Sequence, residues 1–262
     1  MDPLTRVKGF LIDLDGVLYV GDQAISGAKE AIEFLTREQY KFRFVSNTTR
    51  KCRATIARRL SLMGMDIPEK LLFTPPMAAI AYMKNAKKER YFLITTGDVE
   101  NDFDPTGMCT PSMRPDYVVV GDAGEKITYD SLNTAFRFLM DGADLIALEK
   151  DRYWMAPEGL SLSAGPMIAA LEFASGKTAA VMGKPSPAFF GLALQDMGLL
   201  PGQVAMIGDD ITTDIGGAKR AGMTGILVRT GKYHKNLVNS AAIKPDYIID
   251  SIAQITEILQ NR

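Results

Sequence analysis

The chain has 262 residues, 47% of them hydrophobic, which is enough for one large domain or two modest ones with a buried core. Its formal net charge of −1 excludes the concentrated Lys and Arg surface that is typical of proteins that bind nucleic acid or anionic membranes. One histidine and two cysteines leave too few ligands for a zinc site of the usual kind, and the Gly-x-Ser-x-Gly elbow of serine hydrolases is absent.

The hydropathy of the chain predicts a location in the cytoplasm. No apolar run approaches the roughly 18 residues that a membrane-spanning helix needs. Residues 1–6 contain no apolar segment of the kind found in a signal peptide. We therefore expect a cytoplasmic protein that has neither a membrane nor a nucleic acid among its partners.

The first third of the chain alternates predicted strands with predicted helices. The apolar run 10–12 leads into Asp13 and Asp15, which predicts a buried strand that ends in a turn. The order β-α-β-α favours a parallel sheet with helices on its faces. The later elements of this third are a helix at 27–38, a strand at 42–45 and a helix at 52–63.

Pro75 and Pro76 interrupt this alternation, and the opening rhythm returns near Gly183. Between these points we expect a second set of strands and helices, with loop over 95–116. The strands expected after Pro76 are 91–94, 117–120, 145–148, 179–182, 204–207, 225–228 and 247–249. The helices expected there are a short one ending near Lys84, then 131–140, 166–174, 187–197, 214–221 with Asp214 as a candidate N-cap, and 251–259.

Polar side chains follow three of the predicted strands. The carboxyl ends of parallel strands lie along one edge of an open sheet, which is where ligands bind. We therefore expect these side chains to meet although they are far apart in the sequence. They are Asp13 with Asp15, Ser46 with Asn47, and Asp209 with Asp210, and Lys184 at a strand-to-helix junction could join them.

Asp13, Asp15 and Asp209 form an anionic group of hard oxygen donors. Two carboxylates held as close as Asp13 and Asp15 need a cation, a shared proton or open water. Magnesium commonly binds one or two carboxylates, several waters and a substrate phosphate. The group therefore suits Mg²⁺.

Ser46, Asn47 and Lys184 form a complementary site for an anion, together with the backbone N–H groups that follow Asn47. A metal site beside an anion site favours phosphoryl transfer. Asp13 could then be the nucleophile that forms an aspartyl-phosphate, and Asp15 could protonate the leaving oxygen and later activate water.

Four stretches of the chain resemble the four motifs of the haloacid dehalogenase (HAD) superfamily, in the same order and within the same β/α pattern. Within the superfamily they are most similar to the nitrophenylphosphatase/NagD-like branch (subclass IIA), in the subgroup of phospholysine/phosphohistidine/inorganic pyrophosphate phosphatase and its relatives. The four motifs are Asp13-Leu14-Asp15-Gly16, Ser46-Asn47, Lys184, and Gly208-Asp209-Asp210 with Asp214. The stretches 44–49, 183–185 and 229–233 support the assignment.

The resemblance implies an α/β fold: a Rossmann-like parallel-sheet core with an inserted α/β cap domain of the C2 type. The core would comprise residues 1–76 and 183–262, and the cap residues 77–182. It also implies a small phosphorylated substrate, and it leaves open a homodimer formed through the cap.

The family's residue roles carry over to the matching positions. Asp13 would be the nucleophile and Asp15 the general acid and base. Mg²⁺ would be held by the Asp13 side chain, the Asp15 backbone carbonyl and Asp209. Phosphate would be bound by Ser46, Asn47 and Lys184, and the metal site would be supported from outside by Asp214 and Asp210.

The sequence therefore predicts a Mg²⁺-dependent phosphatase that hydrolyses small phosphorylated metabolites, with p-nitrophenyl phosphate as a surrogate substrate. Two alternatives stay open. One is phosphotransfer to a second substrate, as in the mutases of the superfamily. The other is a phospho-accepting signalling module of the response-regulator type, although such a receiver needs neither the long insertion nor the Asp-x-Asp spacing.

Overall fold

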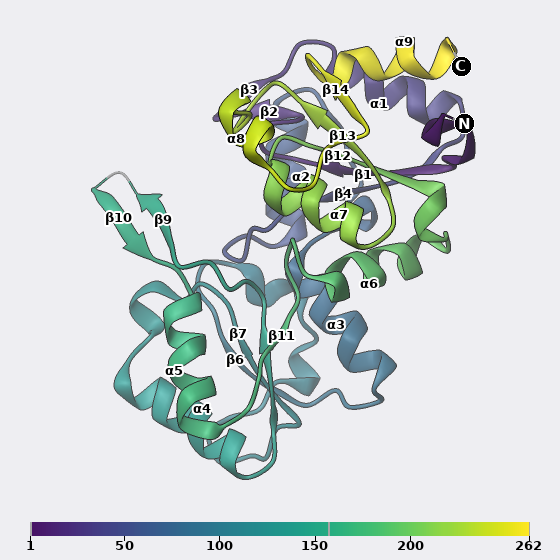
Figure 1. The fold of residues 1–262 in the computed structure, drawn as a ribbon. Helices are drawn as coiled ribbons and strands as arrows, with labels where there is room; N and C mark the ends of the chain where they lie inside the picture. Colours follow the sequence, from purple (N-terminus) through teal and green to yellow (C-terminus); the bar gives the residue numbers. More distant parts are fainter. Residues whose placement is uncertain (1, 157, 262) are drawn as a thin grey trace. The chain divides into compact units, whose positions relative to one another are not determined.

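The computed structural model describes residues 2–156 and 158–261 (Figure 1). The chain divides into two compact units. The first contains the residues up to Ser46, then Ala57–Phe73, and those from Lys184 onward. The second contains Asn47–Ile56 and Thr74–Gly183. Residues 47–56, which the sequence analysis assigns to the core domain, thus belong to the second compact unit. The boundaries of the core and cap domains stay a prediction.

The first unit is built on a six-stranded sheet in which all neighbouring strands are parallel, in the order β14-β13-β12-β1-β4-β5. The central strands β1 and β12 are buried along their whole length, as apolar strands covered on both faces are. The strands are β1 (Gly9–Asp13), β4 (Lys41–Val45), β5 (Leu72–Phe73), β12 (Val204–Gly208), β13 (Thr224–Val228) and β14 (Tyr247–Ile249).

Helices cover both faces of this sheet. Helices α1 and α9 pack against each other on one face, and α6 packs against α7 on the other (Figure 1). The helices are α1 (Ala28–Arg37), α2 (Arg53–Leu62), α6 (Pro187–Met197), α7 (Gly217–Arg220), α8 (Lys235–Ser240) and α9 (Ile255–Gln260). A short hairpin of β2 (Tyr19–Val20) and β3 (Gln23–Ala24) follows β1 and was not predicted.

The helix after β12 begins earlier than the sequence predicts. A π-helical segment, η7 (Ile211–Gly216), precedes α7. Asp210 caps it, because its side chain accepts hydrogen bonds from the backbone N–H groups of Thr212 and Thr213. The prediction of Asp214 as the N-cap is therefore wrong: Asp214 lies inside the helical segment, and its side chain serves another purpose.

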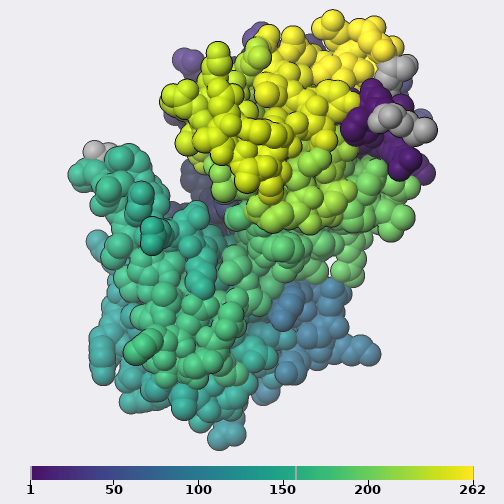
Figure 2. Space-filling model, viewed as in Figure 1, coloured from purple at the N-terminus to yellow at the C-terminus, as the bar shows by residue number. Residues whose placement is uncertain are grey.

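The second unit contains a parallel four-stranded sheet in the order β11-β8-β7-β6. An antiparallel hairpin, which was not predicted, projects from this unit (Figures 1 and 2). The sheet strands are β6 (Tyr91–Ile94), β7 (Tyr117–Val120), β8 (Asp144–Ala147) and β11 (Ala180–Val181), and the hairpin strands are β9 (Tyr153–Ala156) and β10 (Gly159–Leu162). The helices are α3 (Pro75–Asn85), α4 (Tyr129–Met140) and α5 (Gly165–Ser175).

Side chains of β7 and β8 pack with those of α4 and α5 to form the hydrophobic core of the second unit. The expected α/β architecture is thus present, with a parallel sheet at its centre. Among the described residues, no helix has the length and apolar character needed to cross a membrane.

Candidate active site

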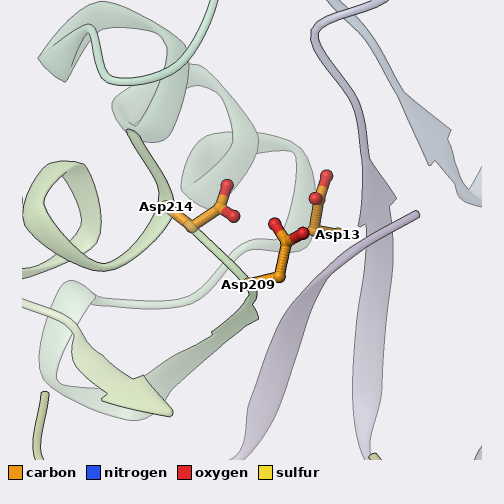
Figure 3. Close-up of side chains that lie close together, drawn as sticks. All are labelled: Asp13, Asp209 and Asp214. Carbon is orange, nitrogen blue, oxygen red and sulfur yellow. The ribbon is translucent and has the colours of Figure 1, made fainter. Parts of the chain in front are cut away.

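Three carboxylates meet at the carboxyl edge of the first unit's sheet. Asp13 is the last residue of β1, Asp209 directly follows β12, and Asp214 lies in η7. Each offers an oxygen that lies within 4.8 Å of the other two (Figure 3). All three side chains are buried. Because β1 and β12 are adjacent parallel strands, the sheet brings together residues from opposite ends of the sequence.

Lys184 forms ion pairs with two of these carboxylates. Its Nζ donates hydrogen bonds to Oδ1 of Asp13 and to Oδ1 of Asp214, each over 2.6 Å. Burial lowers the pKa of a lysine, but the Asp13 and Asp214 carboxylates outweigh this effect and raise the pKa of Lys184 above its usual value. The lysine therefore stays charged, and Asp214 holds it in place beside Asp13.

Asp13 is unusually easy to protonate for an aspartate. Burial, followed by the negative charge of Asp214, raises the pKa of Asp13 to about 7, although Lys184 acts in the opposite direction. Without a cation, the ionised carboxylate is therefore poorly stabilised at neutral pH. A bound divalent cation would favour the ionised form.

Asp209 is held in a tight cradle of backbone. Its Oδ2 accepts a hydrogen bond from the backbone N–H of Lys232 over 2.7 Å. A Cβ atom at Gly16 or at Gly231 would lie 1.9 or 2.0 Å from this oxygen, and both glycines have positive φ. Burial raises the pKa of Asp209 to about 6. Only glycine can therefore stand at these two positions while Asp209 keeps its place.

Lys232 was not among the predicted site residues, although it lies in the stretch 229–233 that supports the family resemblance. Its hydrogen bond to Asp209 comes from the backbone, and the side-chain chemistry on which motif reading depends does not indicate such a bond. Thr230 in the same stretch donates from Oγ1 to the backbone oxygen of Gly16 over 2.5 Å. This stretch thus supports both Asp209 and the turn after Asp15.

Asp15 lies on the same edge, two residues beyond Asp13, but its side chain is exposed and is not part of the carboxylate cluster. The turn after it is closed by a hydrogen bond from the Gly16 N–H to the Tyr19 carbonyl oxygen over 2.7 Å. An exposed carboxylate beside a buried one suits proton exchange with a substrate or with water.

Ser46 follows β4, whose Val45 pairs with Asp13 of β1, so Ser46 lies at the carboxyl edge one strand away from Asp13. Asn47 is the first residue of the second unit. Its side-chain oxygen lies against Gly183, where an added Cβ would be 3.2 Å away. Both residues are half-buried.

The donor set of the cluster matches the preference of Mg²⁺ for hard oxygen ligands. The contacts above engage both oxygens of Asp214, through Lys184 and through the Asp210 N–H at 3.2 Å. They engage one oxygen of Asp13 and one of Asp209. The remaining oxygens of Asp13 and Asp209 are thus the carboxylate donors best suited to a cation.

Comparison with known proteins agrees with this geometry. A family model of haloacid dehalogenase-like hydrolases matches residues 10–109, and a model of HAD-hydrolase-like proteins matches residues 181–255. The human phospholysine phosphohistidine inorganic pyrophosphate phosphatase is 40% identical over 262 residues, which cover 98% of this chain and 95% of the relative. The chain belongs to the family of haloacid dehalogenase-like hydrolases.

Solved structures narrow this class to the nitrophenylphosphatase/NagD-like branch. The 4-nitrophenylphosphatase of Thermotoga maritima superposes with a TM-score of 0.86 at 29% identity, over 97% of this chain and 98% of that one. NagD of E. coli K-12 superposes with a TM-score of 0.84 at 26% identity, over 95% and 98%. The chain is a phosphatase of this branch; the human relative and the Thermotoga maritima neighbour are both named as phosphatases.

Proposed function

We propose that the chain is a Mg²⁺-dependent phosphatase that works through an aspartyl-phosphate on Asp13. The observation that carries this proposal is the position of Asp13: its Oδ1 lies 2.6 Å from the buried ammonium of Lys184, and the same carboxylate belongs to the cluster with Asp209 and Asp214. A nucleophilic carboxylate needs both a fixed orientation and nearby positive charge to approach an anionic phosphate.

In the first half of the reaction, the Asp13 carboxylate attacks the phosphorus of the substrate, and the bond from phosphorus to the leaving oxygen breaks. Asp15 donates its proton to that oxygen. Mg²⁺, held by Asp13, Asp209 and the Asp15 backbone carbonyl, would offset the negative charge of the phosphate oxygens. Lys184, Ser46 and Asn47 would bind the same oxygens.

In the second half, Asp15 accepts a proton from a water molecule, and this water releases phosphate from Asp13. The same group thus serves as acid and then as base. Asp214 takes no direct part: it keeps Lys184 charged and pointed at Asp13.

The substrate would be a small phosphorylated molecule. A human relative is named for phospholysine, phosphohistidine and inorganic pyrophosphate, and a structural neighbour for 4-nitrophenyl phosphate. We infer a similar range here, with residues 77–182 acting as the cap that selects among substrates. A homodimer formed through this cap and a cytoplasmic location belong to the same proposal.

The decisive experiment measures p-nitrophenyl phosphate hydrolysis with Mg²⁺, with EDTA, and with the Asp13→Asn variant. We expect turnover that stops with EDTA, returns when Mg²⁺ is added, and falls by at least about 1,000-fold in Asp13→Asn, because the nucleophile is lost. Circular dichroism checks that the variant is folded. An active and folded Asp13→Asn protein would contradict the proposal.

A further inference from the structure

The exposed Asp15 is joined through its backbone to the hairpin of β2 and β3. Asp15 and Tyr19 form an isolated backbone bridge, and the Gly16 N–H donates to the Tyr19 carbonyl oxygen over 2.7 Å. Tyr19 is the first residue of β2 and pairs with Ala24 of β3. A displacement of Tyr19 would therefore displace the turn that carries Asp15.

One side chain from α2 holds this hairpin. The guanidinium carbon of Arg59 lies 4.6 Å from the centroid of the Tyr19 ring. Its Nη2 donates to the Gly21 carbonyl oxygen over 2.7 Å and to Oδ1 of Asp22 over 3.1 Å. A single guanidinium thus contacts both β2 and the turn between β2 and β3.

These contacts differ in strength. The side chain of Asp22 is 94% exposed, so water and salt screen its ion pair with Arg59. The Tyr19 residue is only 6% exposed, which shields the contact between its ring and the guanidinium. A planar guanidinium can stack on a ring and donate a hydrogen bond at the same time, whereas a lysine ammonium cannot do both with this geometry.

The contacts on the turn itself are made to its backbone. Thr230 Oγ1 binds the Gly16 carbonyl oxygen on one side, and the Tyr19 carbonyl binds the Gly16 N–H on the other. The residue Asp15 itself is exposed. The position of its carboxylate therefore depends on how firmly the backbone around Gly16 is held. The Tyr19 carbonyl supplies part of that support, beside Thr230 and the hydrogen bonds of the turn to the Leu14 carbonyl oxygen.

We propose that Arg59 is a positioning residue for Asp15: through Tyr19 and the β2–β3 turn, it holds the acid–base carboxylate where it can protonate the leaving oxygen. This inference rests on the proposed role of Asp15. The guanidinium touches neither the substrate nor the reacting atoms, so its removal should weaken proton donation while the carboxylates around Asp13 stay in place.

The test compares two leaving groups. Nitrophenolate departs without much help from an acid, whereas the alkoxide of ethyl phosphate needs a proton. In Arg59→Met we expect kcat/KM for ethyl phosphate to fall about tenfold and that for p-nitrophenyl phosphate to fall less than threefold. An equal loss on both substrates would show a merely structural role, and no loss on either would show no role; each result overturns the inference.

Matched variants complete the experiment. Arg58→Met removes an exposed guanidinium from the same helix and should change neither value. Tyr19→Phe keeps the ring and should behave like the parent protein, whereas Arg59→Lys should resemble Arg59→Met, because a lysine does not stack and donate together. A double variant combines Arg59→Met with Tyr19→Leu. Its loss of kcat/KM for ethyl phosphate should be smaller than the sum of the two single losses, because both substitutions remove the same contact between Arg59 and Tyr19.

Asp15→Asn separates the two proposals. If it fails to lower kcat/KM for ethyl phosphate more than for p-nitrophenyl phosphate, the proposed acid role of Asp15 is wrong. The other outcome is that Asp15→Asn lowers kcat/KM for ethyl phosphate more than for p-nitrophenyl phosphate. If Arg59→Met then affects both substrates equally or neither, the proposed function stands and only the inference about Arg59 is wrong.

Discussion

Lys184 lies between two carboxylates whose charges would otherwise repel each other. Each lies 2.6 Å from its Nζ, and Asp209 completes a cluster with three negative groups to one positive group. Burial of this excess negative charge is costly, because desolvation disfavours the charged form of a carboxylate. A bound cation would offset this charge, and the electrostatics of the cluster should be visible in stability as well as in activity.

The excess of carboxylates over ammonium groups in the cluster should make the stability of the protein depend on pH. The pKa of Asp13 is raised to about 7 in the folded chain, from an ordinary value of 3.8, so the folded state binds more protons than the unfolded state between these values. In EDTA, its contribution to the free energy of unfolding is therefore fully present below about pH 4 and is lost as pH rises through 7. Asp209, raised to about 6, acts in the same direction.

Asp13→Asn should remove most of this effect. At pH 8 in EDTA we expect the variant to be more stable than the parent by on the order of 2 kcal/mol, which is several degrees in the unfolding midpoint. At pH 5 the two proteins should differ less. Thermal unfolding at both pH values checks this, and Mg²⁺ should stabilise the parent at pH 8. Equal midpoints for parent and variant at pH 8 would contradict the raised pKa.

Gly231 offers a test of the metal site that leaves every carboxylate in place. Gly231→Ala would put a Cβ 2.0 Å from Oδ2 of Asp209, so Asp209 must move. We expect the Mg²⁺ concentration for half-maximal activity to rise at least about tenfold, which corresponds to roughly 1.4 kcal/mol of binding. Gly64→Ala is the matched control, because Gly64 also has positive φ but an added Cβ would meet nothing within 4 Å. Similar effects of both variants would mean that backbone strain alone is responsible.

At the scale of single elements, one buried carboxylate contacts both ends of the hairpin of β9 and β10. Glu149 follows β8 closely and accepts hydrogen bonds from Ser163 Oγ, from the Ala164 N–H and from the Asp151 N–H. These partners lie on both sides of the hairpin, so one side chain ties its two ends together. Burial raises the pKa of Glu149, while these hydrogen bonds act in the opposite direction.

Glu149→Gln should loosen the hairpin without unfolding the second unit. An amide presents an N–H₂ group where the carboxylate accepts from several donors, so at least one donor loses its partner. Hydrogen exchange should become at least about tenfold faster over 150–163, while β6, β7 and β8 keep their protection. Glu158→Gln, at an exposed position in the same hairpin, serves as the control. Unchanged exchange over 150–163 would show that Glu149 does not hold the hairpin.

At the scale of the whole molecule, buried apolar elements were predictable and exposed hairpin strands were not. The structure has β7 at Tyr117–Val120 and α6 at Pro187–Met197, as the sequence predicts. The hairpin strands β2, β3, β9 and β10 are exposed along much of their length and lack a hydrophobic face toward a core, so their sequences carry little periodicity. Tertiary contacts such as those of Arg59 and Glu149 fix them instead.

The carboxylate cluster was predictable only in part, because some of its contacts depend on three-dimensional structure that a motif does not record. Asp13, Lys184 and Asp209 stand in motifs at strand ends, and a parallel sheet brings such ends together. The roles of Asp210 and Asp214 depend on where the helix after β12 begins, and helix boundaries are the least certain feature of a sequence pattern. The backbone N–H of Lys232 could be found only in three dimensions.

The order of the strands in the first sheet has a consequence for biosynthesis. β1 is made before the second unit, but one of its two neighbours, β12, is made only after the second unit. Until residues 204–208 have left the ribosome, one edge of β1 has no partner, and exposed strand edges invite association with other chains. Asp209 and Asp214 emerge later still, so a nascent or truncated chain that ends before them cannot assemble the carboxylate cluster.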